Sequence, residues 1–180
     1  MQTKLPVAEH TPEPAAARVS ESVADGFKTA FREHPAGVAL ITASTADGPV
    51  GLTASSVASV GLDPVALTFS VTRATGSAGG LLSADPFLVH LLDARHVAIA
   101  GEFAVTGGER FTPEQGWQTL ATGEPHLPGV RAALRCRALQ VTPVGASSAV
   151  IAEVLEVISG EPGAPLVYID RAFRVLPEGE

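Results

Sequence analysis

The stretch from Val50 to Ser77 constrains the fold most, because it contains two strand-like runs joined by a turn sequence. The runs are Leu52 to Val60 and Val65 to Val71, and Gly61-Leu62-Asp63-Pro64 links them. Gly and Pro between two runs of this length are typical of a turn between strands. The stretch therefore predicts two consecutive strands, and the rest of the chain has to supply their partners.

The same stretch is rich in hydroxyl side chains and ends in Thr72-Arg73-Ala74-Thr75-Gly76-Ser77. Arg73 is the only arginine between Arg32 and Arg95. Hydroxyls donate and accept hydrogen bonds, and the arginine guanidinium binds phosphate through a planar fork of donors. A hydroxyl-rich strand followed by an arginine in a hydroxyl-rich turn is therefore typical of a site for a polar ring system with a phosphate tail.

Helical patterns are few along the chain. Ser22 begins a capping-box pattern, and Val23, Phe27 and Phe31 follow at a spacing of four, which predicts a helix from about 22 to 33. The other helix starts are predicted at Ser77 (to Leu82), at Asp93 (to about Ala104) and at Thr112.

Short apolar runs bounded by Gly and Pro make up most of the remaining chain, and such runs predict strands. Few helices among many short strands favour a mainly β barrel or sandwich with helical attachments. The further strands are expected at Gly37–Thr45, Pro86–Leu92, Val130–Val141, Ser148–Ile158 and Pro165–Ile169, with Phe173–Leu176 as a candidate for one more.

Length and composition limit the classes of partner and compartment. For 180 residues one domain is expected, here residues 20–180, preceded by a mobile arm at 1–19 that holds three prolines. The formal net charge is -7 and no run of basic residues occurs, which argues against a nucleic-acid partner. The single cysteine, Cys136, is expected to be a packed core thiol. Since no apolar run approaches membrane-spanning length, a soluble cytoplasmic protein is expected.

The chain lacks the motifs of the common catalytic and nucleotide-binding sites. There is no G-x-x-x-x-G-K-[ST], no G-x-G-x-x-G, no C-x-x-C and no G-x-S-x-G. His90 and His96 lie six residues apart, but across an expected strand end and a helix start, so structural roles are favoured over a zinc site. No nucleophile has an evident base beside it, which is expected when a cofactor carries the reaction.

Several segments taken together resemble the flavin reductase-like family, whose members have an FMN-binding split barrel. The resemblance spans about residues 27–177 and implies a mainly β fold, a split β-barrel of Greek-key type with a few peripheral helices. The segments, in the family's order, are His34–Thr42, Gly51–Val60, Leu62–Pro64, Thr72–Ser77, Phe87–Leu92, Ala98–Ala104, Arg110-Phe111, Leu134–Cys136 and Pro165–Tyr168.

The resemblance also implies where a flavin would bind. The ring would lie along Thr53 to Ser59, where hydroxyls and backbone amides can donate hydrogen bonds to flavin carbonyls and nitrogens. The phosphate would lie near Arg73, and Phe103 would cover a face or an edge of the ring. Neither a catalytic side chain nor a metal ligand is implied. The implied flavin contacts are Thr53, Ala54, Ser55, Ser56, Ser59, Arg73, Thr75, Ser77 and Phe103, and Ser147 and Tyr168 would lie on the nicotinamide side.

Two positions depart from the family's pattern. Many relatives carry Asn where this chain has Ser55, which still donates a hydrogen bond but reaches less far. Many relatives also carry Gly-Asp-His where this chain has Gly145-Ala146-Ser147, and that His lies near the nicotinamide in the family. Ser147 offers no imidazole, so the departure bears on nicotinamide oxidation and not on the flavin phosphate site.

The function that the resemblance implies is an NAD(P)H:flavin oxidoreductase. It would reduce FMN or FAD with NADH or NADPH as co-substrate, form a homodimer, and supply reduced flavin to a partner monooxygenase. An alternative from another class is a flavin-binding carrier or sensor with little reductase activity, which the change at Ser147 motivates. A third is an oxidase like the pyridoxamine phosphate oxidase relatives, although their extra basic contacts for a substrate phosphate are not evident here.

Overall fold

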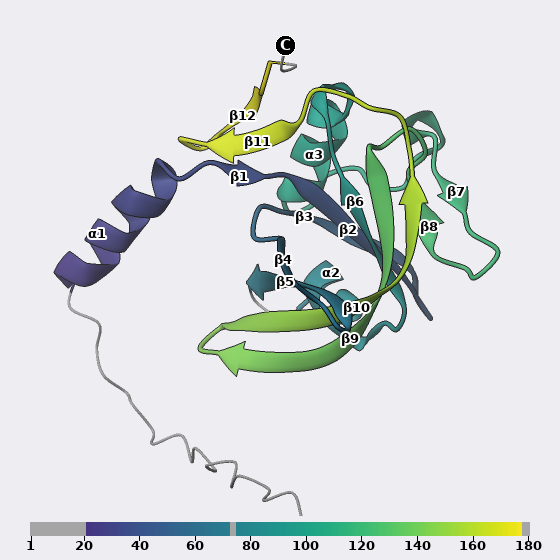
Figure 1. The fold of residues 1–180 in the computed structure, drawn as a ribbon, viewed down its shortest axis with the longest axis horizontal. Coiled ribbons are helices and arrows are strands. Elements are labelled where there is room, and N and C mark those ends of the chain that lie inside the picture. The colour runs from purple at the N-terminus through teal and green to yellow at the C-terminus, as the bar shows by residue number, and fades with distance from the viewer. Residues whose placement is uncertain (1–20, 73–74, 178–180) are drawn as a thin grey trace, which may run out of the picture.

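The computed structural model describes residues 21–72 and 75–177, and its strands form a strongly curved sheet with helices around it (Figure 1). The predicted mobile arm at 1–19 and Arg73 lie outside the described residues. The helices are α1 (Glu21–Arg32), α2 (Ser77–Ser83) and α3 (Val97–Ala104), with short 3₁₀ helices η1 (Ala94–His96) and η2 (Pro113–Gln115). The strands are β1 (Ala36–Gly37), β2 (Ala39–Thr45), β3 (Gly48–Ala54), β4 (Ala58–Leu62), β5 (Val65–Thr72), β6 (Phe87–Leu91), β7 (Gln118–Thr119), β8 (Pro125–His126), β9 (Ala132–Val144), β10 (Ser147–Ser159), β11 (Leu166–Ile169) and β12 (Ala172–Val175).

The main sheet has seven strands in the order β3-β2-β6-β9-β10-β5-β4. Its two edge strands, β3 and β4, are consecutive in the chain and are separated only by residues 55–57. A flat sheet of this size would hold its edges about 29 Å apart, at roughly 4.8 Å per strand. The link from Ala54 to Ala58 spans at most about 14 Å, so the sheet has to curl until its edges approach. The predicted mainly β fold with a few peripheral helices is confirmed, and the curled, open sheet is consistent with a split barrel.

The predicted strand from Leu52 to Val60 is wrong in one respect, because β3 ends at Ala54 and β4 begins at Ala58. The residues between them carry the chain from one edge of the sheet to the other. They therefore cannot belong to a continuous ladder. Small and hydroxyl-bearing residues continue through this crossing without a Gly or Pro, which is why the sequence gives no sign of the break.

Hydrophobic clusters lie on both faces of β2. Ile41 belongs to one cluster with Phe69 and Phe87, whereas its neighbour Leu40 belongs to a second cluster with Phe103. A strand that is buried on both faces reads as a continuous apolar run, which explains the pattern in this part of the sequence. Cys136 is fully buried in the first cluster, and burial raises the pKa of its thiol to about 12. The predicted packed core thiol is confirmed.

Helix α1 projects from the small sheet formed by β1, β11 and β12 (Figure 1). Its C-terminal end is fixed there, because Asp170 N–H donates to Arg32 O at 2.7 Å and the two side chains form an ion pair. The predicted stripe of Val23, Phe27 and Phe31 is present but remains about 60% exposed. Among the described residues, no helix has the length and apolar content needed to cross a membrane.

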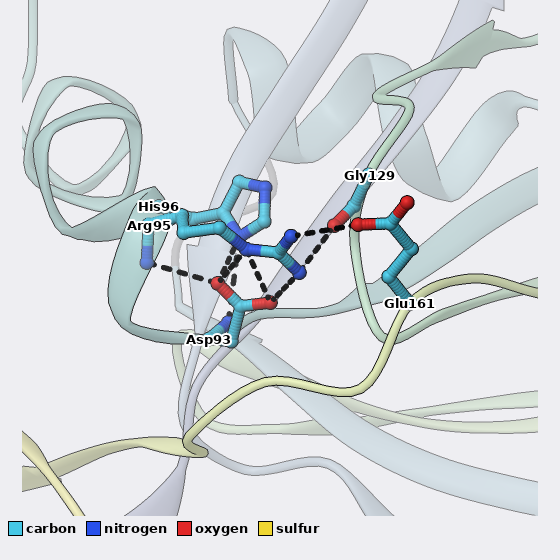
Figure 2. Close-up of polar contacts among 5 residues, drawn as sticks. All are labelled: Asp93, Arg95, His96, Gly129 and Glu161. Carbon is cyan, nitrogen blue, oxygen red and sulfur yellow. Dashed lines mark hydrogen bonds and ion pairs between the residues drawn. The ribbon is translucent and has the colours of Figure 1, made fainter.

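Asp93 is fully buried and begins the segment that leads into α3. Its carboxylate accepts hydrogen bonds from Arg95 N–H at 2.9 Å and Arg95 Nη2 at 2.6 Å, and lies 2.9 Å from His96 Nδ1. Arg95 also donates to Gly129 O at 2.8 Å and pairs with Glu161 (Figure 2). The predicted cap at Asp93 is confirmed. These five residues, called the Asp93 cluster below, fix the start of α3 against two distant loops.

Candidate functional site

A cavity of about 730 Å³ lies at the opening between the two edges of the curled sheet, called the split below. The ends of β3 and β5 line it. Four segments form its walls: residues 52–56, 70–72, 75–78 and 103–107, joined by Arg110. They come from β3 and the following link, the end of β5, the start of α2 and the end of α3. The volume is typical of sites for small molecules and cofactors. The curl of the sheet thus brings together segments that are far apart in the sequence.

Hydroxyl groups provide most of the polar lining. Among the described lining residues there is no Asp, Glu, His or Cys, so no general acid, general base or thiol nucleophile faces the cavity. Arg110 is the one charged side chain in that described lining. The hydroxyl-bearing lining residues are Thr53, Ser55, Ser56, Ser70, Thr72, Thr75, Ser77 and Thr106.

Most of the residues implied as flavin contacts meet at this cavity. Arg73 lies outside the described residues, although Thr72 and Thr75 both line the cavity. Ser59 does not line it, because it lies on β4 opposite Leu67, so its flavin contact stays a prediction. The implied contacts that do line the cavity are Thr53, Ala54, Ser55, Ser56, Thr75, Ser77 and Phe103.

Two of these hydroxyls are already engaged by the protein. Thr53 Oγ1 donates to Ala100 O at 2.7 Å, so only its lone pairs remain for a ligand. Ser56 Oγ accepts from Ser70 N–H at 2.9 Å and donates to Ser70 O at 3.2 Å. Ser56 therefore bonds to the backbone of β5 as a neighbouring strand would, at the point where the chain crosses the split.

Other lining hydroxyls remain available. Ser55 and Thr75 are exposed, and neither hydroxyl has a hydrogen-bond partner in the described part of the chain. Ser77 Oγ accepts from Arg110 Nη1 at 2.6 Å, which leaves the hydroxyl hydrogen of Ser77 free to be donated. The cavity therefore presents at least three unused hydroxyl donors.

Phe103 lines the cavity from within the core and is only 2% exposed. Its ring packs against Phe111 and Trp117, with centroids 5.1 and 5.6 Å away. Gly51 makes this position possible, since a Cβ there would lie 2.7 Å from Phe103 Cε1. The predicted contact of Phe103 with a flavin ring is not tested by this arrangement and stays a prediction.

Arg110 lines the cavity but is not among the flavin contacts that the resemblance implies, and the same holds for Ser70, Thr72 and Thr106. Yet the signal that singled out Arg73 applies equally here, because Arg110 is the only arginine between Arg95 and Arg131 and follows Gly107-Gly108. Its position in the wall depends on the fold, which brings residue 110 back to β3 and α2.

The two residues implied on the nicotinamide side lie at different borders of the cavity. Tyr168 lines a second cavity of about 200 Å³ that shares Thr53, Ser55 and Ala104 with the first. Its ring meets Phe173, also in that lining, at a centroid distance of 5.4 Å. Ser147 is half-buried at the start of β10 and pairs with Thr72. It does not line the first cavity itself.

His90 and His96 have structural roles, and His96 belongs to the Asp93 cluster. His90 is fully buried, with Nδ1 3.0 Å from Leu40 O and Nε2 accepting from Leu127 N–H at 3.1 Å. Its ring stacks on His126 with centroids 5.8 Å apart. Within residues 21–72 and 75–177, no group of three or more His, Cys, Asp or Glu side chains is placed to hold a metal ion.

The chain is similar to known proteins over most of its length. The family described as flavin reductase like domain matches residues 31–177. An NADH:FMN oxidoreductase of Rhodococcus qingshengii is 36% identical, over 97% of this chain and 96% of its own length. The reductase component of an FADH(2)-dependent resorcinol hydroxylase from Rhizobium sp. is 32% identical, over 82% of this chain and 84% of its own length.

A solved structure gives the same result for the fold. The flavin reductase domain protein from Arthrobacter sp. FB24 aligns with a TM-score of 0.80 and 31% identity, covering 87% of this chain and 98% of that chain. Both the family match and the relatives cover well over half of the sequence. The resemblance inferred from the ordered segments is confirmed: the chain belongs to the flavin reductase-like family.

Proposed function

We propose that this chain is an NAD(P)H:flavin oxidoreductase, which reduces FMN or FAD by hydride transfer from NADH or NADPH. The observation that carries the proposal is the 730 Å³ cavity, whose described lining offers hydroxyls and one arginine but no acid, base or thiol. Hydride transfer between two cofactors depends on aligning their rings and needs no protein acid or base at the reacting atoms. A relative named NADH:FMN oxidoreductase, similar over nearly the whole chain, supports the same function.

The residues present fit a phosphorylated flavin. Flavin carbonyls and ring nitrogens accept hydrogen bonds, and Ser55 at the end of β3 has an unused hydroxyl to donate. Thr75 and Ser77, which also line the cavity, offer further hydroxyls, and Ser77 lies beside the positively charged guanidinium of Arg110. Arg73 falls between two lining residues in the sequence, and we assign it to the phosphate on that ground.

The protein's own contribution is to hold two rings in a fixed relation. When bound, the flavin supplies the hydride acceptor and the nicotinamide nucleotide supplies the hydride. Thr53 is fixed by Ala100 O and Ser56 by Ser70, so neither wall of the split needs to reorganise around a ligand. Preorganisation of this kind lowers the barrier by removing the entropy cost of alignment.

The second cavity is the proposed place for part of the nicotinamide nucleotide. It adjoins the first through shared lining residues and is flanked by the rings of Tyr168 and Phe173. Flat heteroaromatic rings stack favourably on such side chains. A ring held there would lie next to Ser55 and hence next to a flavin in the larger cavity.

A homodimer is proposed as the working form. The chain exposes large apolar side chains that a monomer would leave in water, on β4 and on the long β9–β10 hairpin, and such surfaces commonly mark interfaces. Leu62 is 88% exposed, Val144 62% and Val157 57%. A partner monooxygenase in the cytoplasm is the proposed consumer of reduced flavin, by analogy with the relative that is the reductase component of a hydroxylase.

The alternative is a flavin carrier or sensor with little reductase activity. The observation that favours it is the serine at position 147, which lies opposite Thr72 at the border of the cavity and offers no imidazole. A carrier would bind flavin through the same hydroxyls but would not oxidise nicotinamide. The two functions therefore differ in turnover and not in flavin affinity.

One assay separates the two. The full chain is purified, FMN or FAD is added, and the consumption of NADH and NADPH is followed at 340 nm. Turnover with at least one nucleotide is expected for the reductase. Saturable flavin binding without turnover with either nucleotide would reject it and favour the carrier.

A further inference from the structure

Arg110 connects three walls of the cavity through its guanidinium. Nη1 donates to Gly51 O at 3.2 Å and to Ser77 Oγ at 2.6 Å, and Nη2 donates to Val105 O at 2.7 Å. These acceptors belong to β3, to the start of α2 and to the segment after α3. These three hydrogen bonds hold the guanidinium in one place at the wall of the cavity.

The positive charge of Arg110 is not neutralised by the protein. Arg135, which is buried to a similar degree, pairs with Glu124, with Nε 2.6 Å from Oε1. Arg110 forms no ion pair with any carboxylate in the described part of the chain, and its Nε is buried without a hydrogen-bond partner. A partly buried cation without a counter-ion is costly. An anionic ligand in the cavity, which Arg110 lines, would supply the missing counter-charge.

Ser77 presents a hydroxyl hydrogen to the cavity beside the charge of Arg110. Since its oxygen accepts from Arg110, its own hydrogen is the part that remains to be donated, and Ser77 lines the cavity. A hydroxyl polarised by a guanidinium is a good donor to a phosphate oxygen. Arg110 and Ser77 therefore form one unit that is suited to an anionic group.

Phe103 packs against the guanidinium of Arg110. Arg110 Cζ lies 5.5 Å from the centroid of the Phe103 ring, within the range of a cation–π contact. The ring can occupy this position only because residue 51 is glycine. Gly51, Phe103 and Arg110 thus form a packed series that ends at Ser77, and Phe103 acts through the arginine.

We propose that Arg110, together with Ser77, binds the phosphate group of the flavin and so makes the site selective for phosphorylated flavins over riboflavin. The proposal rests on the proposed function, because it assigns a residue to that same site. It adds a fixed cation to the phosphate site, which the sequence had assigned to Arg73. It also gives Phe103 the role of a positioning residue for that cation.

The test compares FMN with riboflavin, which lacks the phosphate, by titrating each into the protein and following the quenching of flavin fluorescence. Arg110→Gln is expected to weaken FMN binding about 10- to 100-fold, as for the loss of a charge-assisted hydrogen bond. Riboflavin binding should change less than about 3-fold. Arg137→Gln removes an exposed arginine of the β9–β10 hairpin, paired with Glu153, and should change neither affinity.

A second variant guards against misfolding of the first. Ser77→Ala keeps the arginine and its bonds to Gly51 O and Val105 O. It should weaken FMN about 3- to 10-fold with riboflavin unchanged. Equal losses for the two flavins in both variants would overturn the proposal and leave Arg110 a purely structural residue, and so would unchanged FMN affinity in Ser77→Ala.

The outcome is separable from that of the proposed function. If the wild-type chain consumed neither NADH nor NADPH, yet Arg110→Gln selectively lost FMN, the reductase would be rejected while the phosphate contact stood. If turnover were normal and the two variants lost both flavins equally, the reductase would stand and the assignment of Arg110 would fall.

Discussion

The Asp93 cluster and the wall around Arg110 both contain an arginine held by hydrogen bonds, but within the described residues only the arginine of the cluster is paired with a carboxylate. In the cluster, a fully buried carboxylate is bonded by Arg95 and His96, and Arg95 finds further acceptors in two loops. At the cavity, Arg110 has three neutral acceptors and no carboxylate among the described residues. A closed network fixes one conformation, whereas an open one leaves charge for a ligand to complete. The contrast separates polar residues that stabilise the fold from those that we propose to bind a ligand.

The largest effect is expected from opening the closed network. Asp93→Ala removes the helix cap and the carboxylate that Arg95 and His96 share, and should lower the free energy of unfolding by about 4 kcal/mol. Urea unfolding followed by circular dichroism measures the loss. Arg110→Gln should cost less stability than this, and an equal cost would show that the wall around Arg110 is as closed as the cluster.

Acidification should also lower the free energy of unfolding, through the buried side chain of His90. Burial, the largest influence, lowers the pKa of His90 to about 3, although its bond to Leu40 O opposes the shift. Because an unfolded histidine has a pKa near 6.5, the unfolded chain binds the proton first as the pH falls. Stability is therefore complete above pH ~6.5 and declines toward pH ~3, with a loss of about 3 kcal/mol by pH 4.

The measurement is urea unfolding at several pH values between 7 and 4. His90→Gln should flatten the dependence on pH, whatever its own effect on stability at pH 7. An unchanged slope in the variant would mean that other groups cause the acid sensitivity. The described cavity lining contains no His, Asp or Glu, so it should contribute nothing to this slope.

A substitution behind the open wall should affect both stability and binding. Gly51→Ala places a methyl group 2.7 Å from Phe103 Cε1, so the ring has to move and takes the support of Arg110 with it. Overpacking of this kind should cost about 2 kcal/mol, and FMN affinity should fall more than riboflavin affinity. Gly61→Ala is the matched control, since a Cβ there meets nothing within 4 Å. Stability equal to that of the control would contradict the close packing at Gly51.

The smallest effect on stability is expected from substituting the adjacent serines Ser55 and Ser56. Ser56→Ala removes both bonds to the Ser70 backbone and should cost about 1 kcal/mol in thermal or urea unfolding. Ser55→Ala removes an exposed hydroxyl without a partner in the described residues, and should leave stability within about 0.5 kcal/mol. Flavin binding should respond in the reverse order, and a larger stability loss for Ser55→Ala would contradict the distinction.

Features formed within one short segment could be predicted from the sequence. Contacts that depend on the curl of the sheet could not. The caps at Asp93 and Thr112 could be predicted because each capping side chain bonds to its own segment. The paired use of Ser56 and Ser70 could not, because fourteen residues and a crossing of the sheet separate them. Arg110 carried the same isolated-arginine pattern as Arg73, but only tertiary structure places it beside Ser77.

The site itself was predicted in part for the same reason. Hydroxyls such as Ser55 and Thr75 could be grouped by sequence alone because both lie in the one stretch from Val50 to Ser77. Thr106 joined them only through α3, whose start is fixed by the Asp93 cluster. The family resemblance indicated the ligand class, and the structure shows which hydroxyls the protein itself engages and which remain unused.

The short link between β3 and β4 limits how far the two edges of the sheet can separate at the site. Both edge strands are held in ladders, β3 with β2 and β4 with β5, so the edges can move apart only as far as residues 55–57 allow. The largest possible width of the slot between the two edges is therefore set by the covalent length of this link. Insertion or deletion in this link is the direct way to widen or narrow the slot, while substitutions on its walls change what the slot prefers to hold.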